Sequence, residues 1–269
     1  MQYDPIKSSL GKVFNKSPFL RIVFYKLLDI LLLRTWHIKK DVKKWTRTRI
    51  NESEILDAGS GFGQYSYFLS ALKPKANITG VDVKEEQIED CNKFFKNIGR
   101  TNTFFKTCDL TTFRENEKFD LILCVDVMEH IKDDVKVFEN FCSSLKQGAM
   151  LLISTPSDQG GSDAHGHDGG ESFIGEHVRD GYNIKEIGEK LLKAGFSKVD
   201  TRFVYGIPGK ISWRLSMKYP ILLLGVSKLF FVFLPFYYLV TFPFCLLLNY
   251  FDLTGKHKTG TGLIVKAWK

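Results

Sequence analysis

One short stretch, ILDAGSGFG at residues 55–63, places an acid and three glycines where a parallel strand would end. Ile55 and Leu56 form an apolar lead into Asp57, and glycines then follow at every second position. A Cβ at such turn positions would keep the backbone from closing tightly or from lying against a ligand. A helix that starts just after the turn points its free N–H groups toward the same crevice. The stretch therefore predicts a ligand-binding turn between a buried strand and a helix.

Acidic residues also end the next two apolar runs. Asp82 closes ITGVD nineteen residues after Gly63, and Asp109 closes FFKTCD. A carboxylate at the tip of the second strand can accept hydrogen bonds from both hydroxyls of a ribose. Because the carboxyl ends of parallel strands meet at one edge of a sheet, we expect these acids and the glycine turn to face a common crevice.

The elements that must position these residues are five apolar runs that alternate with helix-length segments. This alternation predicts an α/β domain with a doubly wound parallel sheet and helices on both of its faces. The polar residue after each run marks the edge at which a ligand binds. The runs lie within residues 55–63, 78–88, 104–113, 119–131 and 149–158.

The glycine spacing distinguishes two kinds of nucleotide-binding turn. A dinucleotide fingerprint needs glycine at its sixth position, where this chain has Gln64, so a nicotinamide oxidoreductase is disfavoured. The spacing instead resembles motif I of the class I S-adenosylmethionine-dependent methyltransferases. The string DVMEH at 126–130 resembles a segment of ubiquinone-pathway O-methyltransferases, and the resemblance covers about residues 50–205. It implies a Rossmann-like sheet of seven strands, of which the seventh, at 260–269, is antiparallel.

The resemblance also implies how the cofactor, S-adenosyl-L-methionine, would be held. The glycine turn would line its methionine end, Asp82 would hold the ribose, and Asp109 would meet the adenine amine. Val125 would back the adenine ring. The expected cofactor-binding residues are Asp57, Gly59, Ser60, Gly61, Gly63, Asp82, Val83, Asp109, Leu110 and Val125.

A base is needed if the methyl acceptor is an alcohol or a phenol, because its proton must be removed. A histidine that titrates near neutral pH suits this task, so His130 is the first candidate and His177 the second, with Glu129 beside them. In a helix that starts near Asp126, the spacing i, i+3 and i+4 would put Asp126, Glu129 and His130 on one face.

Two groups of residues leave a metal site open as an alternative. In some of the resembling enzymes, the residues that match Asp126, Glu129 and His130 hold a divalent cation. They can equally border the cofactor pocket, and we favour this because one histidine and two acids lack the spacing of a metal motif. His165 and His167 either bind a metal or are incidental in a flexible segment. We predict no metal at either group.

A long glycine- and histidine-rich loop, residues 157–183, follows the fifth predicted strand. A loop of this length at the ligand edge is usually functional, and we expect it to form a lid on the substrate side. By resemblance, His177 and Arg179 lie near the substrate mouth. A helix over 183–194 should follow and stop at Gly195.

Charge and cysteine content limit the cellular setting. Residues 1–50 carry a net charge of +9, and the remainder carries −1. Such a basic segment could meet nucleic acid or an anionic membrane, or it could be a helix that caps the active site. A nucleic-acid methyltransferase should have Asn-Pro-Pro-Tyr after the fourth strand, where this chain has DVME, so we expect no nucleic-acid partner. Five cysteines without a Cys-x-x-Cys pair indicate a reducing compartment.

A hydrophobic segment, residues 211–258, separates the last two predicted strands. Residues 229–248 hold no charge, but Pro235 and Pro243 fall among them. The seventh strand must return to pair beside the sixth, so an even number of membrane crossings, or none, is required. Two helices of about 14–18 residues, split at Pro235, are too short to span a ~30 Å hydrocarbon core. We therefore expect a hairpin that dips into one leaflet; the alternatives are a buried hairpin over the sheet edge and a dimer interface.

These patterns divide the chain into basic amphipathic helices at 1–50, a methyltransferase domain at 51–210 and 259–269, and a hairpin insertion at 211–258. We expect methyl transfer to a hydrophobic small molecule or lipid, at the cytoplasmic face of a membrane, with a homodimer as an option. O-methylation of a hydroxyl is favoured, and C- or carboxyl-methylation is the alternative. A non-catalytic, membrane-associated scaffold that binds the cofactor is the alternative from another class.

Overall fold

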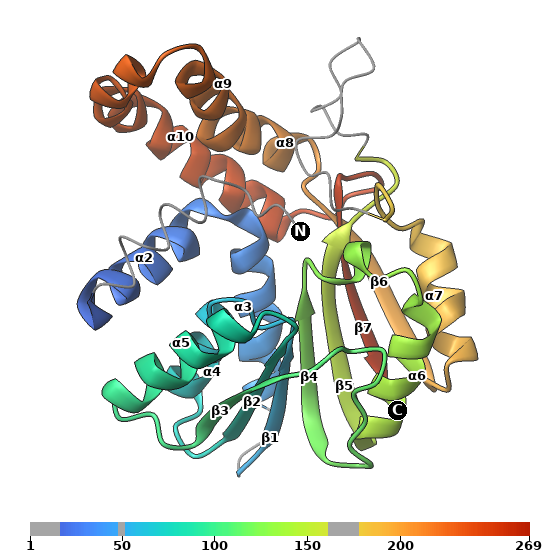
Figure 1. Ribbon diagram of the computed structural model, residues 1–269. Coiled ribbons are helices and arrows are strands. Elements are labelled where there is room, and N and C mark those ends of the chain that lie inside the picture. Colours follow the sequence, from blue (N-terminus) through green and yellow to red (C-terminus); the bar gives the residue numbers. More distant parts are fainter. Residues whose placement is uncertain (1–16, 48–51, 161–177) are drawn as a thin grey trace.

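The computed structural model describes residues 17–47, 52–160 and 178–269. Its centre is a seven-stranded sheet in the order β3-β2-β1-β4-β5-β7-β6 (Figure 1). The first five strands are parallel, and β7 runs antiparallel to both β5 and β6. The predicted Rossmann-like sheet with an antiparallel seventh strand is confirmed. The strands are β1 (Glu54–Ala58), β2 (Asn77–Asp82), β3 (Thr103–Thr107), β4 (Phe119–Val125), β5 (Leu145–Pro156), β6 (Lys198–Val204) and β7 (Gly262–Trp268).

Helices cover both faces of the sheet and bury its apolar strands. One apolar cluster joins the central strands to Phe138 of α6 and Leu191 of α7. A second joins Ile55 and Ile78 to Leu69 of α4. The predicted helix before β6 is present, with Asn183 as its N-cap. The covering helices are α4 (Gln64–Leu72), α5 (Glu85–Asn97), α6 (Asp134–Ser144) and α7 (Ile184–Lys193).

The N-terminal helices α2 (Pro18–Leu31) and α3 (Leu33–Arg47) pack on the domain. Ile38, Val42 and Trp45 of α3 belong to the same buried cluster as Ile55. Two of its basic residues also bind to neighbouring elements. Lys39 forms an ion pair with Asp29 of α2, and Lys40 donates a hydrogen bond to the carbonyl of Leu253. Helix α3 is therefore part of the core and not a freely solvated basic face.

The hydrophobic insertion is a helical hairpin that projects from one end of the sheet (Figure 1). It starts at Ile207, slightly earlier than expected, and its second helix contains Pro243 without ending there. The expected lengths of 14–18 residues are wrong, because α10 alone has 21 residues. Pro235 sits in the first turn of α10, where a missing N–H costs no helical hydrogen bond. The elements are α8 (Ile207–Trp213), a π-helical turn (Arg214–Lys218), α9 (Tyr219–Val226), a 3-10 turn (Lys228–Val232) and α10 (Leu234–Thr254).

Asp252 fastens the base of the hairpin to the domain. Its side chain is fully buried and accepts hydrogen bonds from the backbone N–H groups of Tyr205 (3.1 Å) and Gly209 (3.1 Å). Nε2 of His37 on α3 lies 3.0 Å from the same carboxylate. The start and the end of the hairpin are thus held together against α3.

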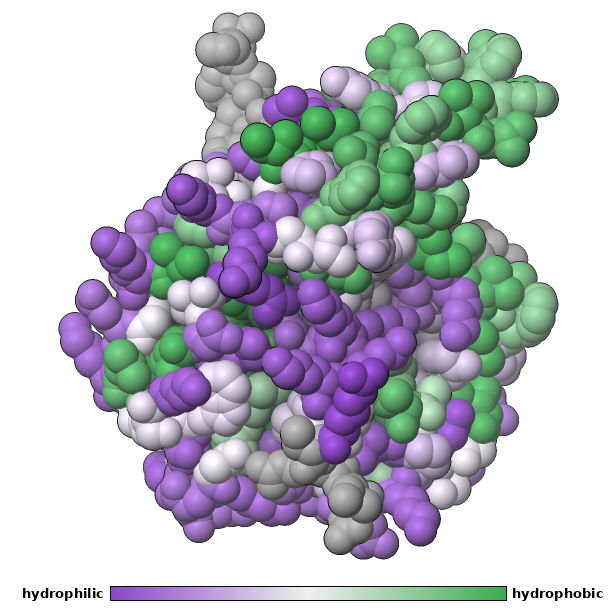
Figure 2. Space-filling model, turned by 180° about the vertical axis from the view of Figure 1, so that it is seen from behind, coloured by the Kyte–Doolittle hydropathy of each residue, from purple (hydrophilic) through white to green (hydrophobic). Residues whose placement is uncertain are grey.

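The outer part of the hairpin leaves its apolar side chains uncovered (Figure 2). Helix α10 is long and apolar enough to cross a bilayer, and only 11% of its most apolar window is buried. The interpretation of the hairpin as a buried cover of the sheet edge is therefore wrong. The uncovered residues of its tip and outer face include Leu229, Phe233, Phe236, Leu239, Val240 and Phe244, which are 61–76% exposed.

Candidate active site

The glycine turn after β1 needs its glycines for two different reasons. Gly59 and Gly61 both have a left-handed backbone, with φ of 74° and 50°. A Cβ on Gly59 would lie 2.2 Å from Cγ2 of Val127, so this position packs against the segment after β4. A Cβ on Gly61 would come no closer than 3.9 Å to any neighbour, the nearest being Oε1 of Gln87. The face of Gly61 is therefore open to a ligand.

Asp82 lies at the tip of β2, directly beside this turn. Its Oδ2 accepts a hydrogen bond from the Gly61 N–H (2.9 Å), and its Oδ1 accepts one from the Lys84 N–H (3.1 Å). Each hydrogen bond uses one lone pair of the Asp82 carboxylate, which is held in place and can still accept hydrogen bonds from a ligand. Asp82 is paired in register with Thr107, which places the Asp109 segment next to it. The Asp109 carboxylate accepts from the Thr111 N–H and hydroxyl, both at 2.8 Å.

Asp57 and Ser60 occupy the interior of the turn. The Asp57 side chain is only 2% exposed and accepts from the hydroxyl of Ser66 on α4 at 2.6 Å. Burial raises the pKa of Asp57 to about 6. The structure thus places this carboxylate beneath the turn, where it fixes the start of α4. Ser60 Oγ is buried and has no partner among the described residues, which leaves one polar group of the turn for a ligand.

The remaining cofactor candidates differ in exposure. Val83, just past Asp82, is 51% exposed, whereas Leu110 is buried in the core. Val125, at the end of β4, is partly buried. Val83 and Val125 can therefore offer an apolar surface to a bound ring, while Leu110 supports the loop from within.

The segment after β4 departs from the predicted helix. Asp126 has φ of 53°, Met128–His130 form only a 3-10 turn, and α6 begins at Asp134. Glu129 is buried and accepts from the Thr155 hydroxyl at 3.2 Å, whereas His130 is exposed. The expectation that the two acids and the histidine share one helical face is therefore wrong. The left-handed turn at Asp126 changes the direction of the chain before a helix can form.

Glu129 is the titratable residue of this segment with the strongest perturbation. Burial, together with the nearby charge of Asp126, raises the pKa of Glu129 to about 8. Its carboxyl group is therefore largely protonated at neutral pH and can donate a hydrogen bond rather than take a proton.

Residues 51–190, more than half of the chain, match a family described as "Methyltransferase domain". The chain belongs to the methyltransferase domain family. It is 31% identical over 108 residues to a ubiquinone biosynthesis O-methyltransferase of Actinobacillus pleuropneumoniae, a match that covers 38% of this chain and 45% of that protein. It is 28% identical over 108 residues to (S)-coclaurine N-methyltransferase of Papaver somniferum, covering 40% of this chain and 31% of that protein.

Solved methyltransferases share the fold. Phosphoethanolamine N-methyltransferase 2 of Haemonchus contortus, in complex with S-adenosyl-L-methionine, superposes with a TM-score of 0.57 at 17% identity. That superposition covers 91% of this chain and 60% of the other. This chain spans less than half the length of the curated relatives that it matches. With the family shown, its cofactor is S-adenosyl-L-methionine.

Arg34 is a functional candidate of the methyltransferase that sequence reasoning missed. The Arg34 guanidinium donates to the carboxylate of Asp126, and its backbone N–H donates to the Tyr205 hydroxyl at 3.0 Å. Burial alone would lower the pKa of Arg34, but the neighbouring acidic groups, with Asp126 the strongest, outweigh it and raise the pKa above its ordinary value. No spacing in the sequence links Arg34 to residues so far along the chain, so no local signal could have found this contact.

Two tyrosines complete the polar cluster around Arg34. The Tyr65 hydroxyl on α4 lies 3.4 Å from Oγ1 of Thr35, and Tyr205 follows the end of β6. Burial raises the pKa of Tyr205 to about 12 and also raises that of Tyr65, so both remain neutral donors. A polar residue just past the end of β6 was a usable signal for Tyr205.

The lid histidines His165, His167 and His177 lie outside the described residues. Arg179 lies within them, and its guanidinium donates to Asp134 and to the carbonyl of Ile131 (2.8 Å). The backbone N–H of Val178 donates to the carbonyl of Glu129 at 3.0 Å. The segment after the predicted lid is therefore anchored beside Glu129, with Arg179 engaged in holding the start of α6.

Proposed function

We propose that this methyltransferase moves a methyl group from S-adenosyl-L-methionine to a hydroxyl group of a hydrophobic molecule dissolved in a membrane. The observation that carries the proposal is the uncovered apolar hairpin joined to the site at its base. Tyr205 lies two residues before the hairpin, its hydroxyl accepts from the backbone N–H of Arg34, and the Arg34 side chain pairs with Asp126 at the tip of β4. An apolar acceptor held by the hairpin would thus lie near the strand tips.

The strand tips fit the cofactor. A nucleoside with an amino-acid end would complete three features: the open face at Gly61, the Ser60 hydroxyl that lacks a partner within the described part of the chain, and the fixed carboxylate of Asp82. Asp82 would accept the ribose hydroxyls, Asp109 the adenine amine, and the glycine turn would lie along the methionine end. The bound cofactor supplies an electrophilic methyl on a sulfonium. The protein holds donor and acceptor in line and excludes water.

For the proton of the acceptor, we propose His130 as the base. Glu129 holds its own proton at neutral pH, which makes it a poor base but a suitable hydrogen-bond donor. His177 is the second candidate. The name of the relative from Actinobacillus pleuropneumoniae supports a hydroxyl acceptor.

We propose that the hairpin inserts into one leaflet at the cytoplasmic face, because α10 is the one described helix long and apolar enough to cross a bilayer, and a single crossing would separate β7 from β6. Both ends of the hairpin join neighbouring strands, β6 and β7, so the chain leaves and returns on the same side. Burying one large apolar side chain contributes about 1.5–3 kcal/mol, so the exposed residues suffice for firm binding to a bilayer.

The test is to incubate the full chain with methyl-labelled cofactor and membrane vesicles that carry a host lipid extract, and then to separate the products. Label in an organic-soluble methyl ether supports the proposal. Label released as methanol by mild base would instead identify a carboxyl acceptor. Cofactor binding without any transfer would favour the non-catalytic scaffold, and label confined to water-soluble products would overturn the membrane acceptor.

A further inference from the structure

The inner face of α2 binds to the glycine turn. Arg21, Tyr25 and Asp29 recur at every fourth position and therefore share one face of the helix. The Arg21 guanidinium donates to the carbonyl of Phe62 at 2.7 Å, and the Tyr25 hydroxyl donates to the same carbonyl. Asp29 accepts a hydrogen bond from the side chain of Gln64, the first residue of α4, at 3.0 Å. These three polar side chains fix α2 on the turn at the strand tips.

The outer face of α2 is apolar. Phe19, Leu27 and Ile30 are 71%, 45% and 43% exposed. Their spacing places them on one face of the helix, roughly opposite Arg21 and Tyr25, which are 2% and 0% exposed. A surface helix of a soluble protein has the reverse arrangement, with its apolar stripe toward the core and its polar residues toward water. The outer face of α2 is therefore suited to apolar surroundings.

The charge on the outer face has one sign. Lys26 is exposed beside Leu27. Asp29, the one acid within residues 18–31, has a side chain that is 13% exposed and forms an ion pair with Lys39 of α3. Exposed apolar side chains next to a free-standing positive charge suit an anionic lipid layer, because the apolar groups enter the layer while the ammonium group reaches the phosphates.

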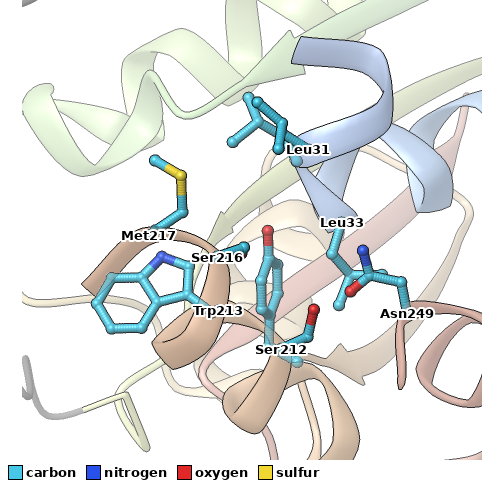
Figure 3. A pocket seen from close by; sticks show the side chains of 9 residues that line it. Leu31, Leu33, Ser212, Trp213, Ser216, Met217 and Asn249 are labelled. Atoms are coloured by element: carbon cyan, nitrogen blue, oxygen red, sulfur yellow. The ribbon is translucent and has the colours of Figure 1, made fainter. Parts of the chain in front are cut away.

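The end of α2 lies beside the base of the hairpin. Leu31 of α2 and Trp213 and Met217 of the hairpin line one narrow crevice of about 10 Å³, which has room for about one water molecule (Figure 3). Trp213 is 37% exposed, and tryptophan is enriched where a bilayer meets water. Both α2 and the hairpin extend from the domain to the same side (Figure 1). Their uncovered apolar faces are therefore placed to meet one surface.

We propose that the outer face of α2 is a second membrane contact, which lies in the headgroup region of an anionic lipid layer while the hairpin inserts more deeply. The inference rests on the proposed function for the presence of a bilayer, and it adds the surface that orients the domain on it. Because the inner face of α2 contacts Phe62, the glycine turn lies about one helix diameter, roughly 10–12 Å, from the lipid. An acceptor in the layer thus has a short path to the strand tips.

The test reports whether α2 contacts lipid. A nitrobenzoxadiazole label, which brightens in apolar surroundings, is attached to the full chain at Leu27→Cys. The background carries Cys108→Ser, because the other four cysteines are buried. The matched control carries the label at Leu192→Cys, an exposed apolar position on α7. Vesicles of equal parts phosphatidylcholine and phosphatidylglycerol are added, with a nitroxide quencher either on the lipid headgroup or deep in the acyl chain.

We expect the label on α2 to brighten by at least about twofold on the vesicles, with stronger quenching by the headgroup nitroxide than by the deep one. The label on α7 should show neither change. In the chain labelled on α2, Lys26→Gln should weaken vesicle binding by about fivefold, the effect of one cation near an anionic surface. Lys185→Gln, at an exposed position of α7, is the matched control and should not change it.

A label on α2 that stays in water while the chain is bound to vesicles would overturn the inference and leave the insertion of the hairpin intact. Stronger quenching by the deep nitroxide would overturn it too, as would an unchanged vesicle affinity in Lys26→Gln. A label that is bright before vesicles are added would show that protein covers the outer face, and ultracentrifugation would reveal whether a second copy does so.

The outcome is separate from that for methyl transfer. Contact of α2 with lipid in a chain that methylates nothing would remove the proposed reaction and keep the inference. Methylation of a membrane acceptor without this contact would do the reverse. A chain that failed to bind vesicles at all would overturn both the inference and the membrane part of the proposed function.

Discussion

The guanidinium of Arg34 donates to the carboxylate of Asp126 and so joins the start of α3 to the tip of β4. Asp126 has a left-handed backbone, with φ of 53°, and its N–H donates to the carbonyl of Ser154 on β5. The carboxylate is therefore held in place by the sheet, and the arginine is brought to it by the N-terminal helices. This contact therefore ties the N-terminal helices to the segment that also carries Glu129.

Replacing Arg34 with methionine keeps the aliphatic stem and removes the charge. Because both partners of the pair are partly exposed, at 37% and 28%, we expect a stability loss of no more than about 1 kcal/mol. Displacement of α3 from the strand tip should lower kcat/KM by about tenfold to a hundredfold. Kinetics and urea unfolding measure the two effects, with Lys44→Met on the exposed face of α3 as the control. An unchanged kcat/KM would show that the pair has no part in the reaction.

Removing the Asp82 carboxylate should weaken cofactor binding. In Asp82→Ala the ribose hydroxyls lose a charged acceptor, which is worth about 1.5–3 kcal/mol or roughly a tenfold to hundredfold rise in Kd. Calorimetry with S-adenosylhomocysteine measures this Kd. Glu86→Ala, at an exposed position on α5, should leave it unaltered. If both variants bound equally well, the ribose would have to be held elsewhere.

The buried Glu129 predicts a pH dependence of stability. Its pKa in the folded protein, about 8, lies above the value near 4.3 of an unfolded chain, so the folded state retains the proton over this window. The contribution of Glu129 to the free energy of unfolding is therefore fully present below about pH 4.3. It falls by roughly 1.4 kcal/mol per pH unit as the pH rises toward 8.

Glu129→Gln should lack this loss. Urea unfolding at pH 5, 7 and 9 compares the two proteins, and the variant should gain in relative stability at each step. Parallel pH profiles for the two proteins would contradict the raised pKa.

Polar substitutions on the hairpin should release the protein from membranes. Phe236, Leu239 and Val240 are 69%, 76% and 65% exposed, and each would bury its side chain in a bilayer. The triple change to asparagine should reduce co-sedimentation with anionic liposomes by at least about tenfold.

The matched control changes three exposed apolar residues of the sheet domain, Phe104, Val135 and Leu192, to asparagine. It should bind liposomes as the unmodified chain does. Should the hairpin variant instead keep its liposome binding but change from a dimer to a monomer in solution, the hairpin would be a subunit interface.

Local patterns were enough for much of the fold. Alternating apolar runs and helix-length segments predicted the sheet, and the glycine turn with Asp82 predicted the nucleoside edge, because strand ends and tight turns depend on neighbouring residues. The helix expected at Asp126 failed for a reason outside the local pattern. The turn there is set by the hydrogen bond to Ser154 and by the burial of Glu129, which only packing decides.

The sequence by itself determined the kind of domain and predicted the edge of the sheet at which we propose that the cofactor binds, since residue type and spacing encode strands, turns and their tips. The tertiary structure alone decided which distant residues meet there. Arg34 reaches Asp126 across 92 residues, and Tyr205 reaches the backbone of Arg34 across 171. The burial of the Asn249 side chain is of the same kind, because burial depends on the packing of the whole chain and not on neighbouring residues.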